Sequence, residues 1–146
     1  MAPQIASQTL KIIGYVSIGF ALAIAGAAWP PTSGLFNFLY DMVDWPMDGA
    51  ATVIFEQTRL LGAISGGVFA SWSVLLILIV APAIARGDEE IRRAAVTAIL
   101  VWFFIDSAGS LAAGFPVNAA FNSVYLASLL APLLMVKKNI ARVAAS

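Results

Sequence analysis

Asp106 is the first residue in this sequence that could do chemistry, because it is an acidic side chain within an otherwise apolar stretch. A charge at the depth of a membrane costs about 2.5–3.5 kcal/mol on insertion scales, and it therefore needs a partner, water or a proton. Such a carboxyl group can carry a proton or bind a ligand. It can also be a structural acceptor of hydrogen bonds that fixes how two helices pack. The sequence leaves both interpretations open.

Other polar side chains are expected at the depth of Asp106 on neighbouring helices. Asp106 lies about 12 Å before Gly114, the end of its apolar stretch, at a helical rise of about 1.5 Å per residue. Asn118, Asn122 and Tyr125 share one helix face by their i, i+4 and i, i+3 spacing. The polar cluster that we predict consists of Glu56, Arg59, Ser65, Asp106, Asn118, Asn122 and Tyr125.

Arg59 and Asp106 are expected to form the core of this cluster. The long stem of an arginine can lie along apolar surface while its guanidinium reaches a distant partner. In the alternative interpretation, Arg59 pairs with Glu56 at the surface and Asn118 caps its own helix. Asp106 would then act only in helix packing.

The residue types exclude several kinds of chemistry. The chain contains no cysteine and no histidine, which are the usual ligands of zinc, haem and iron–sulfur centres. Their absence also removes Ser-His-Asp and Cys-His catalysis. We therefore expect no catalytic motif, no metal site and no cofactor. The net charge is zero, so there is no overall field to attract nucleic acid.

The composition indicates an integral membrane protein. Hydrophobic residues make up 61% of the chain and charged residues 11%, whereas a soluble domain carries about 45–50% apolar and about 25% charged residues. A soluble fold of this size would expose too much apolar surface. We predict one all-α membrane domain over residues 1–146, built as a bundle of four transmembrane helices.

Four apolar stretches are long enough to cross a membrane, at about 20 residues for each span. Pro30 ends the first stretch because proline cannot donate the next backbone hydrogen bond, and Pro116 opens the fourth. The short link over 114–116 makes the last two helices antiparallel neighbours. Pro82 is an expected bend in the second stretch. The predicted spans are residues 10–29, 58–85, 94–113 and 117–136.

The first stretch has a second interpretation, as a signal peptide cleaved near residue 28. Ala25, Gly26 and Ala27 resemble a small-residue cleavage site. However, Lys11 is the only basic residue before it, and the apolar run is longer than the usual 7–15 residues. A retained helix is favoured.

An interfacial helix is predicted over 34–43, between the first two spans. Its apolar side chains share one face at helical spacing, as expected for a helix that lies flat on a membrane. Those side chains are Leu35, Phe38, Leu39, Met42 and Val43. Tyr40 suits the headgroup level of a bilayer. An irregular loop is the alternative.

The basic residues predict the orientation. Positive residues gather at the cytoplasmic ends of membrane helices. All but Arg59 fall on one predicted side: Lys11, Arg86, Arg92, Arg93, Lys137, Lys138 and Arg142. Both termini are therefore expected in the cytoplasm. Alanine-rich helices and short loops favour the inner (plasma) membrane of a bacterium.

Small residues at i, i+4 spacing let helices approach closely in lipid. The pairs Gly62/Gly66 and Ser110/Gly114 are therefore candidates for helix packing, within one chain or between two copies, and packing within one chain is favoured. Trp102 lies in mid-span with an N–H group that prefers a partner when buried.

Three functions compete. The first is a non-enzymatic accessory, scaffold or assembly subunit of a larger membrane complex, whose partners would be the bilayer and other membrane subunits or further copies of this chain. The second is the binding or transport of a small molecule, lipid, quinone or proton at Asp106. The third is a membrane enzyme that acts on a lipid-like substrate, which the sequence favours least.

Overall fold

The computed structural model describes residues 1–50 and 55–136. It confirms an all-helical chain with four helices long and apolar enough to cross a membrane, Pro3–Ala28, Glu56–Arg86, Glu89–Ala112 and Pro116–Leu134. Along the chain the elements are α1 (Pro3–Ala25), the 3₁₀ turns Gly26–Ala28 and Pro30–Thr32, α2 (Ser33–Val43), α3 (Glu56–Leu75), a π-helical turn (Leu76–Val80), α4 (Ala81–Arg86), α5 (Glu89–Ala112) and α6 (Pro116–Leu134).

Two helices begin earlier than their apolar stretches. α1 starts at Pro3 rather than residue 10, and Ala6 and Ser7 in its added turns are buried. α5 starts at Glu89 rather than residue 94 because the Asp88 side chain accepts a hydrogen bond of 3.0 Å from the backbone N–H of Ile91. That contact caps the helix by satisfying a free backbone donor.

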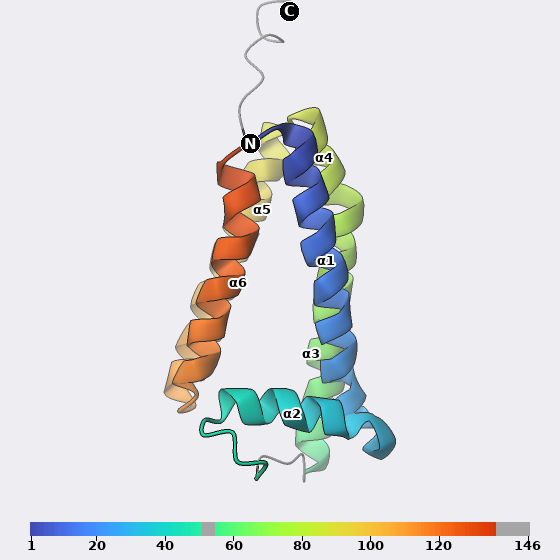
Figure 1. Ribbon diagram of the computed structural model, residues 1–146, viewed down its shortest axis with the longest axis vertical. Coiled ribbons are helices and arrows are strands. Elements are labelled where there is room, and N and C mark those ends of the chain that lie inside the picture. The colour runs from blue at the N-terminus through green and yellow to red at the C-terminus, as the bar shows by residue number, and fades with distance from the viewer. Residues whose placement is uncertain (51–54, 137–146) are drawn as a thin grey trace, which may run out of the picture.

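The helices form two antiparallel pairs (Figure 1). α1 packs along α3 and α4, and α5 packs along α6. The pairs meet at the end that carries the N-terminus and the α4–α5 link, and they separate toward the other end, where α2 lies across the bundle (Figure 1). We call the two regions the closed half and the open half.

The first pair is held by glycines at which the two helices touch. A Cβ atom on Gly66 would lie 2.5 Å from the carbonyl oxygen of Ala21, and one on Gly62 would lie 2.7 Å from the Cβ of Ala27. Only glycine allows the helices to approach this closely. The Gly62/Gly66 face therefore packs against α1 within the same chain.

Ser110 and Gly114 have different roles from the packing contact that their spacing predicts. A Cβ atom on Gly114 would meet nothing within 4 Å. Its φ of 88° places it in the left-handed region that favours glycine after a helix. Ser110 takes part in a side-chain hydrogen-bond network instead.

The hydrophobic core lies in the closed half. Leu10, Ile99, Leu129 and Leu133 are completely buried and come from α1, α5 and α6. Leu76, Ala81 and Ile84 join them from the second long helix. This second helix remains continuous past Pro82. Proline has no backbone N–H to donate, and the π-helical turn directly before α4 accommodates the loss of that hydrogen bond.

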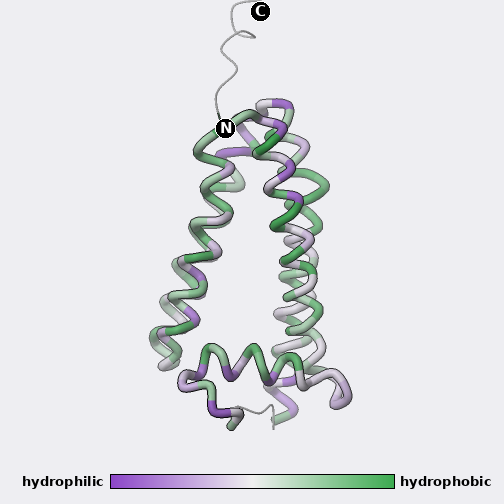
Figure 2. Tube along the Cα trace, viewed as in Figure 1, coloured by the Kyte–Doolittle hydropathy of each residue, from purple (hydrophilic) through white to green (hydrophobic). Residues whose placement is uncertain are grey.

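Hydrophilic residues are concentrated at the two ends of the bundle (Figure 2). The acidic residues Asp41, Asp44 and Asp48 belong to α2 and the segment after it, in the open half. Arg86 and Arg92 flank the α4–α5 link at the opposite end. The expected orientation in the membrane depends on this separation of acidic and basic residues between the two ends. The orientation itself stays a prediction. Residues 137–142 lie outside the described part of the chain.

Candidate functional site

The Asp106 carboxylate accepts hydrogen bonds from four side chains in the open half. Its Oδ1 accepts from Asn122 Nδ2 at 2.9 Å and from Asn118 Nδ2 at 3.2 Å. Ser110 Oγ lies 3.2 Å from the same oxygen, and its single proton is shared with the backbone carbonyl of Asp106 at 2.8 Å. Its Oδ2 accepts from Trp102 Nε1 at 3.2 Å. All four donors are neutral. Hydrogen bonds to a charged group contribute about 1.5–3 kcal/mol each, and together these bonds hold a carboxylate between two apolar helices.

Helical spacing and one short turn bring these groups together. Trp102, Asp106 and Ser110 follow one another at i, i+4 on α5, and Asn118 and Asn122 do so on α6. The turn after α5 directs the chain straight back, so the two faces meet. Asn118 also donates to Ser110 Oγ at 2.8 Å, which ties the network across both helices.

A pocket of about 430 Å³ lies beside this network, and we call it the Asp106 pocket. Asp106, Ser110 and Asn118 supply its polar wall, and Tyr40 and Val43 of α2 contribute from another side. The remaining lining residues are Ile105, Gly109, Ala113 and Phe115. Asp106 is only partly buried, so its carboxylate is still accessible from the pocket.

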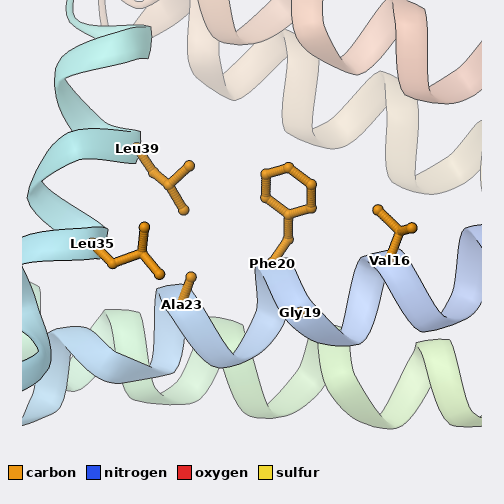
Figure 3. Close-up of a pocket in the computed structure, with 6 residues that line it drawn as sticks. All are labelled: Val16, Gly19, Phe20, Ala23, Leu35 and Leu39. Atoms are coloured by element: carbon orange, nitrogen blue, oxygen red, sulfur yellow. The ribbon is translucent and has the colours of Figure 1, made fainter.

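A second pocket, of about 230 Å³, lies on the first helix pair, and we call it the α1 pocket. Its lining is formed by Val16, Gly19, Phe20 and Ala23 of α1 with Leu35 and Leu39 of α2. Figure 3 shows Phe20 and Leu39 pointing into the same space. Within residues 1–50 and 55–136, no polar side chain lines this pocket.

The position of α2 depends on aromatic and polar contacts. The ring of Tyr40 lies 5.7 Å from that of Phe115, at the turn between α5 and α6, and 6.2 Å from that of Phe36. The buried Asp41 accepts hydrogen bonds from the backbone N–H of Gly49 at 3.1 and 3.2 Å. Asp41 lies off the apolar face predicted for this helix, and the helical pattern gives no sign of this local bond.

Tyr125 links the two helix pairs to each other and is not part of the Asp106 hydrogen-bond network. Its hydroxyl lies 2.6 Å from Ser17 Oγ on α1. Its ring contacts Trp102 edge-on at 5.5 Å and Phe69 at 6.0 Å. It is therefore linked to Asp106 only through the indole of Trp102. Ser17 was not anticipated, because a lone serine in an apolar helix gives no specific signal.

The predicted members on α3 lie apart from Asp106. Glu56 and Ser65 are exposed, and the Nε atom of Arg59 is buried without a hydrogen-bond partner in the described part of the chain. The expected ion pair between Arg59 and Asp106 does not form. The reason is that α3 packs against α1, whereas Asp106 lies between α5 and α6.

Ion pairs within residues 1–50 and 55–136 join Glu89 to Arg92 and Arg93, far from this site. Within the same ranges, no group of three or more acidic residues could hold a metal ion. Neither a scan against protein-family models nor searches of curated proteins and solved structures found a match to this chain.

Proposed function

We propose that this chain is a multi-pass membrane protein that binds a small amphipathic molecule, with the polar head of the ligand in the Asp106 pocket. One observation carries the proposal. The Asp106 carboxylate is held rigidly by its own helix pair and also lines a pocket of about 430 Å³ that α2 covers in part. Intramembrane acidic residues are expensive and are usually functional. The proposed setting is a bacterial plasma membrane, with both termini in the cytoplasm.

The pocket favours a ligand that donates hydrogen bonds. Asp106 Oδ2 has a single donor, Trp102, and an ionised carboxylate oxygen can accept more than one bond. Asn118 lines the same pocket, and the oxygen of its side-chain amide can only accept hydrogen bonds. Among the residues that the structure describes, no basic side chain lines the pocket. An amine or hydroxyl head therefore fits, and the like charge of Asp106 disfavours a carboxylate or phosphate head.

Gly109 offers a direct test. It lines the Asp106 pocket, and a Cβ atom there would meet nothing within 4 Å. A Gly109→Leu substitution can thus fill the pocket without displacing the backbone. Gly67→Leu is the matched control, because Gly67 is equally open and lies on α3 away from both pockets.

The measurement is a titration of the protein with dodecylamine in phosphatidylcholine nanodiscs, followed by Trp102 fluorescence with the other tryptophans replaced by Phe. We expect a saturable change that Gly67→Leu leaves intact, while Gly109→Leu and Asp106→Asn weaken it at least tenfold. Dodecanoate should give no saturable change. Equal binding by the Gly109→Leu protein, or no saturation in any variant, would refute the proposal.

A second candidate is an accessory or scaffold subunit, and one observation favours it. Arg59 carries a cationic guanidinium at the open end with no ion-pair partner in the described ranges, and a carboxylate of another subunit could provide one. The test is gentle solubilisation of native membranes followed by mass measurement. A stoichiometric partner that Arg59→Ala releases supports this role, and isolation only as a free monomer contradicts it.

An enzymatic role has weaker support. An acid–base reaction on a lipid-like substrate would need Glu56 or Arg59 beside Asp106, and neither lies there. Asp106 alone, with four hydrogen-bond donors directed at it, is an acceptor held in place.

A further inference from the structure

The α1 pocket is built for an apolar group and is left unfilled by the protein itself. Its lining consists of Val16, Gly19, Phe20 and Ala23 together with two leucines of α2. Val16 and Phe20 are 55% and 50% exposed, and the space beside Gly19 is open. On its other face the same helix touches its neighbour closely, since a Cβ on Gly14 would lie 2.5 Å from the Ile77 side chain.

Helix α2 connects the α1 pocket with the Asp106 pocket. Leu35 and Leu39 line the α1 pocket, and Tyr40 and Val43 line the Asp106 pocket. Leu39 and Tyr40 are adjacent in the chain, so neighbouring residues of one helix line the two pockets. The length from Leu35 to Val43 is about 12 Å at about 1.5 Å per residue. One leaflet of a hydrocarbon core of about 30 Å is about 15 Å deep, so a single lipid chain can cover this distance.

We propose that the α1 pocket holds the hydrocarbon tail of the same ligand whose head binds at Asp106. This rests on the proposed function and makes the ligand a long-chain amine or alcohol. The head lies among acceptors between α5 and α6, and the tail follows α2 to the apolar lining of α1. In this proposal the ligand passes along α2, which contributes residues to both the polar and the apolar pocket.

The dimensions favour a hydrocarbon chain over a partner helix. A helix with its side chains is about 10–12 Å across, which is broad for a pocket of about 230 Å³. The lining offers no polar group that would orient a peptide. Lipid chains need no such group, and Val16, Phe20, Leu35 and Leu39 supply only apolar contact.

The test locates the tail of a bound probe. Dodecylamine that carries a diazirine at the far end of its chain is photolysed with the full-length protein in phosphatidylcholine nanodiscs, and the labelled residues are identified by mass spectrometry. We expect labelling at α1 pocket residues, with at least tenfold competition by unlabelled dodecylamine. Leu22 lies on α1 at similar depth, is 64% exposed and lines neither pocket. Any labelling there should resist competition.

Gly19→Leu is the decisive variant, because Gly19 lines the α1 pocket and a Cβ atom there would meet nothing within 4 Å. We expect it to reduce the competed labelling at least tenfold, while Gly67→Leu reduces it less than twofold. Unchanged labelling in the Gly19→Leu protein overturns the inference. Competed labelling confined to lipid-facing residues such as Leu22 overturns it as well.

The outcomes separate this inference from the proposed function. If dodecylamine changes Trp102 fluorescence saturably but its tail does not label α1, the head site stands and the tail site fails. If neither response saturates, the function itself fails. In native membranes, a photo-crosslinking residue at Phe20 should capture lipid. Capture of a protein there would identify the occupant as a partner helix or a second copy, and would also overturn the inference.

Discussion

In the closed half of the bundle, Leu10, Ile99 and Leu129 are completely buried, whereas in the open half Val16 and Phe20 are about half exposed. The two helix pairs meet through apolar side chains in the closed half and separate in the open half. The polar network of Asp106 lies in the open half and belongs to the α5–α6 pair alone. The comparison shows that the apolar core shared by both helix pairs and the polar network of Asp106 lie in different regions of the bundle. Four predictions test how the contacts in these regions contribute to stability.

The largest effect is expected at the glycine contact between α1 and α3. Gly66→Leu should prevent stable folding, because a side chain at Gly66 would collide with the backbone of α1, 2.5 Å from Ala21 O. Gly67→Leu, one residue further on, should be tolerated because the space there is open. Thermal unfolding in detergent, followed by circular dichroism, compares the two variants. Similar melting curves would show that the close approach is unimportant.

In the core of the closed half, Leu129→Ala should lower the free energy of unfolding by about 2–5 kcal/mol, the usual range for a buried leucine replaced by alanine. Leu35→Ala in the α1 pocket should lower it far less, because Leu35 is already 56% exposed. Unfolding in mixed micelles measures both values. Equal losses would contradict the division into a closed and an open half.

The Asp106 network should respond unequally to the loss of its two asparagines. Asn122→Ala removes a buried donor at 2.9 Å from Asp106 Oδ1 and should cost about 1–3 kcal/mol. Asn118→Ala removes a longer bond to Asp106, of 3.2 Å, and one of 2.8 Å to Ser110, but Asn118 is less buried than Asn122 and its loss should cost less. The same unfolding assay ranks the variants. The reverse order would mean that Asn118, rather than Asn122, holds the carboxylate.

The smallest of the four effects is expected at the bond that joins the two pairs. Tyr125→Phe removes the contact with Ser17 at 2.6 Å and should cost about 0.5–1.5 kcal/mol, the net contribution of one ordinary hydrogen bond. Ser17→Ala should cost a similar amount, and the double variant should cost little more than either, since both remove one interaction. Strictly additive losses would show that the two hydroxyls act independently.

The meeting of Asp106 with Asn118 and Asn122 could be predicted from the sequence, since helices joined by a short turn must be antiparallel neighbours and the turn sets their register. The position of Arg59 could not. Which helices pack together beyond immediate neighbours depends on how closely their surfaces fit, and the glycine face of α3 fits α1. The two pockets also depend on the angle between the pairs, which leaves no trace in residue spacing.

The tight turn between α5 and α6 has a consequence for biosynthesis in a membrane. Asp106 and the asparagines that bond it are carried on one helical hairpin. If these helices cross a membrane, the hairpin would enter lipid with the Asp106 carboxyl group already hydrogen-bonded by its own amide groups. The acidic residue would then need no contact with α1 or α3 during insertion, and those helices would pack against the hairpin afterwards.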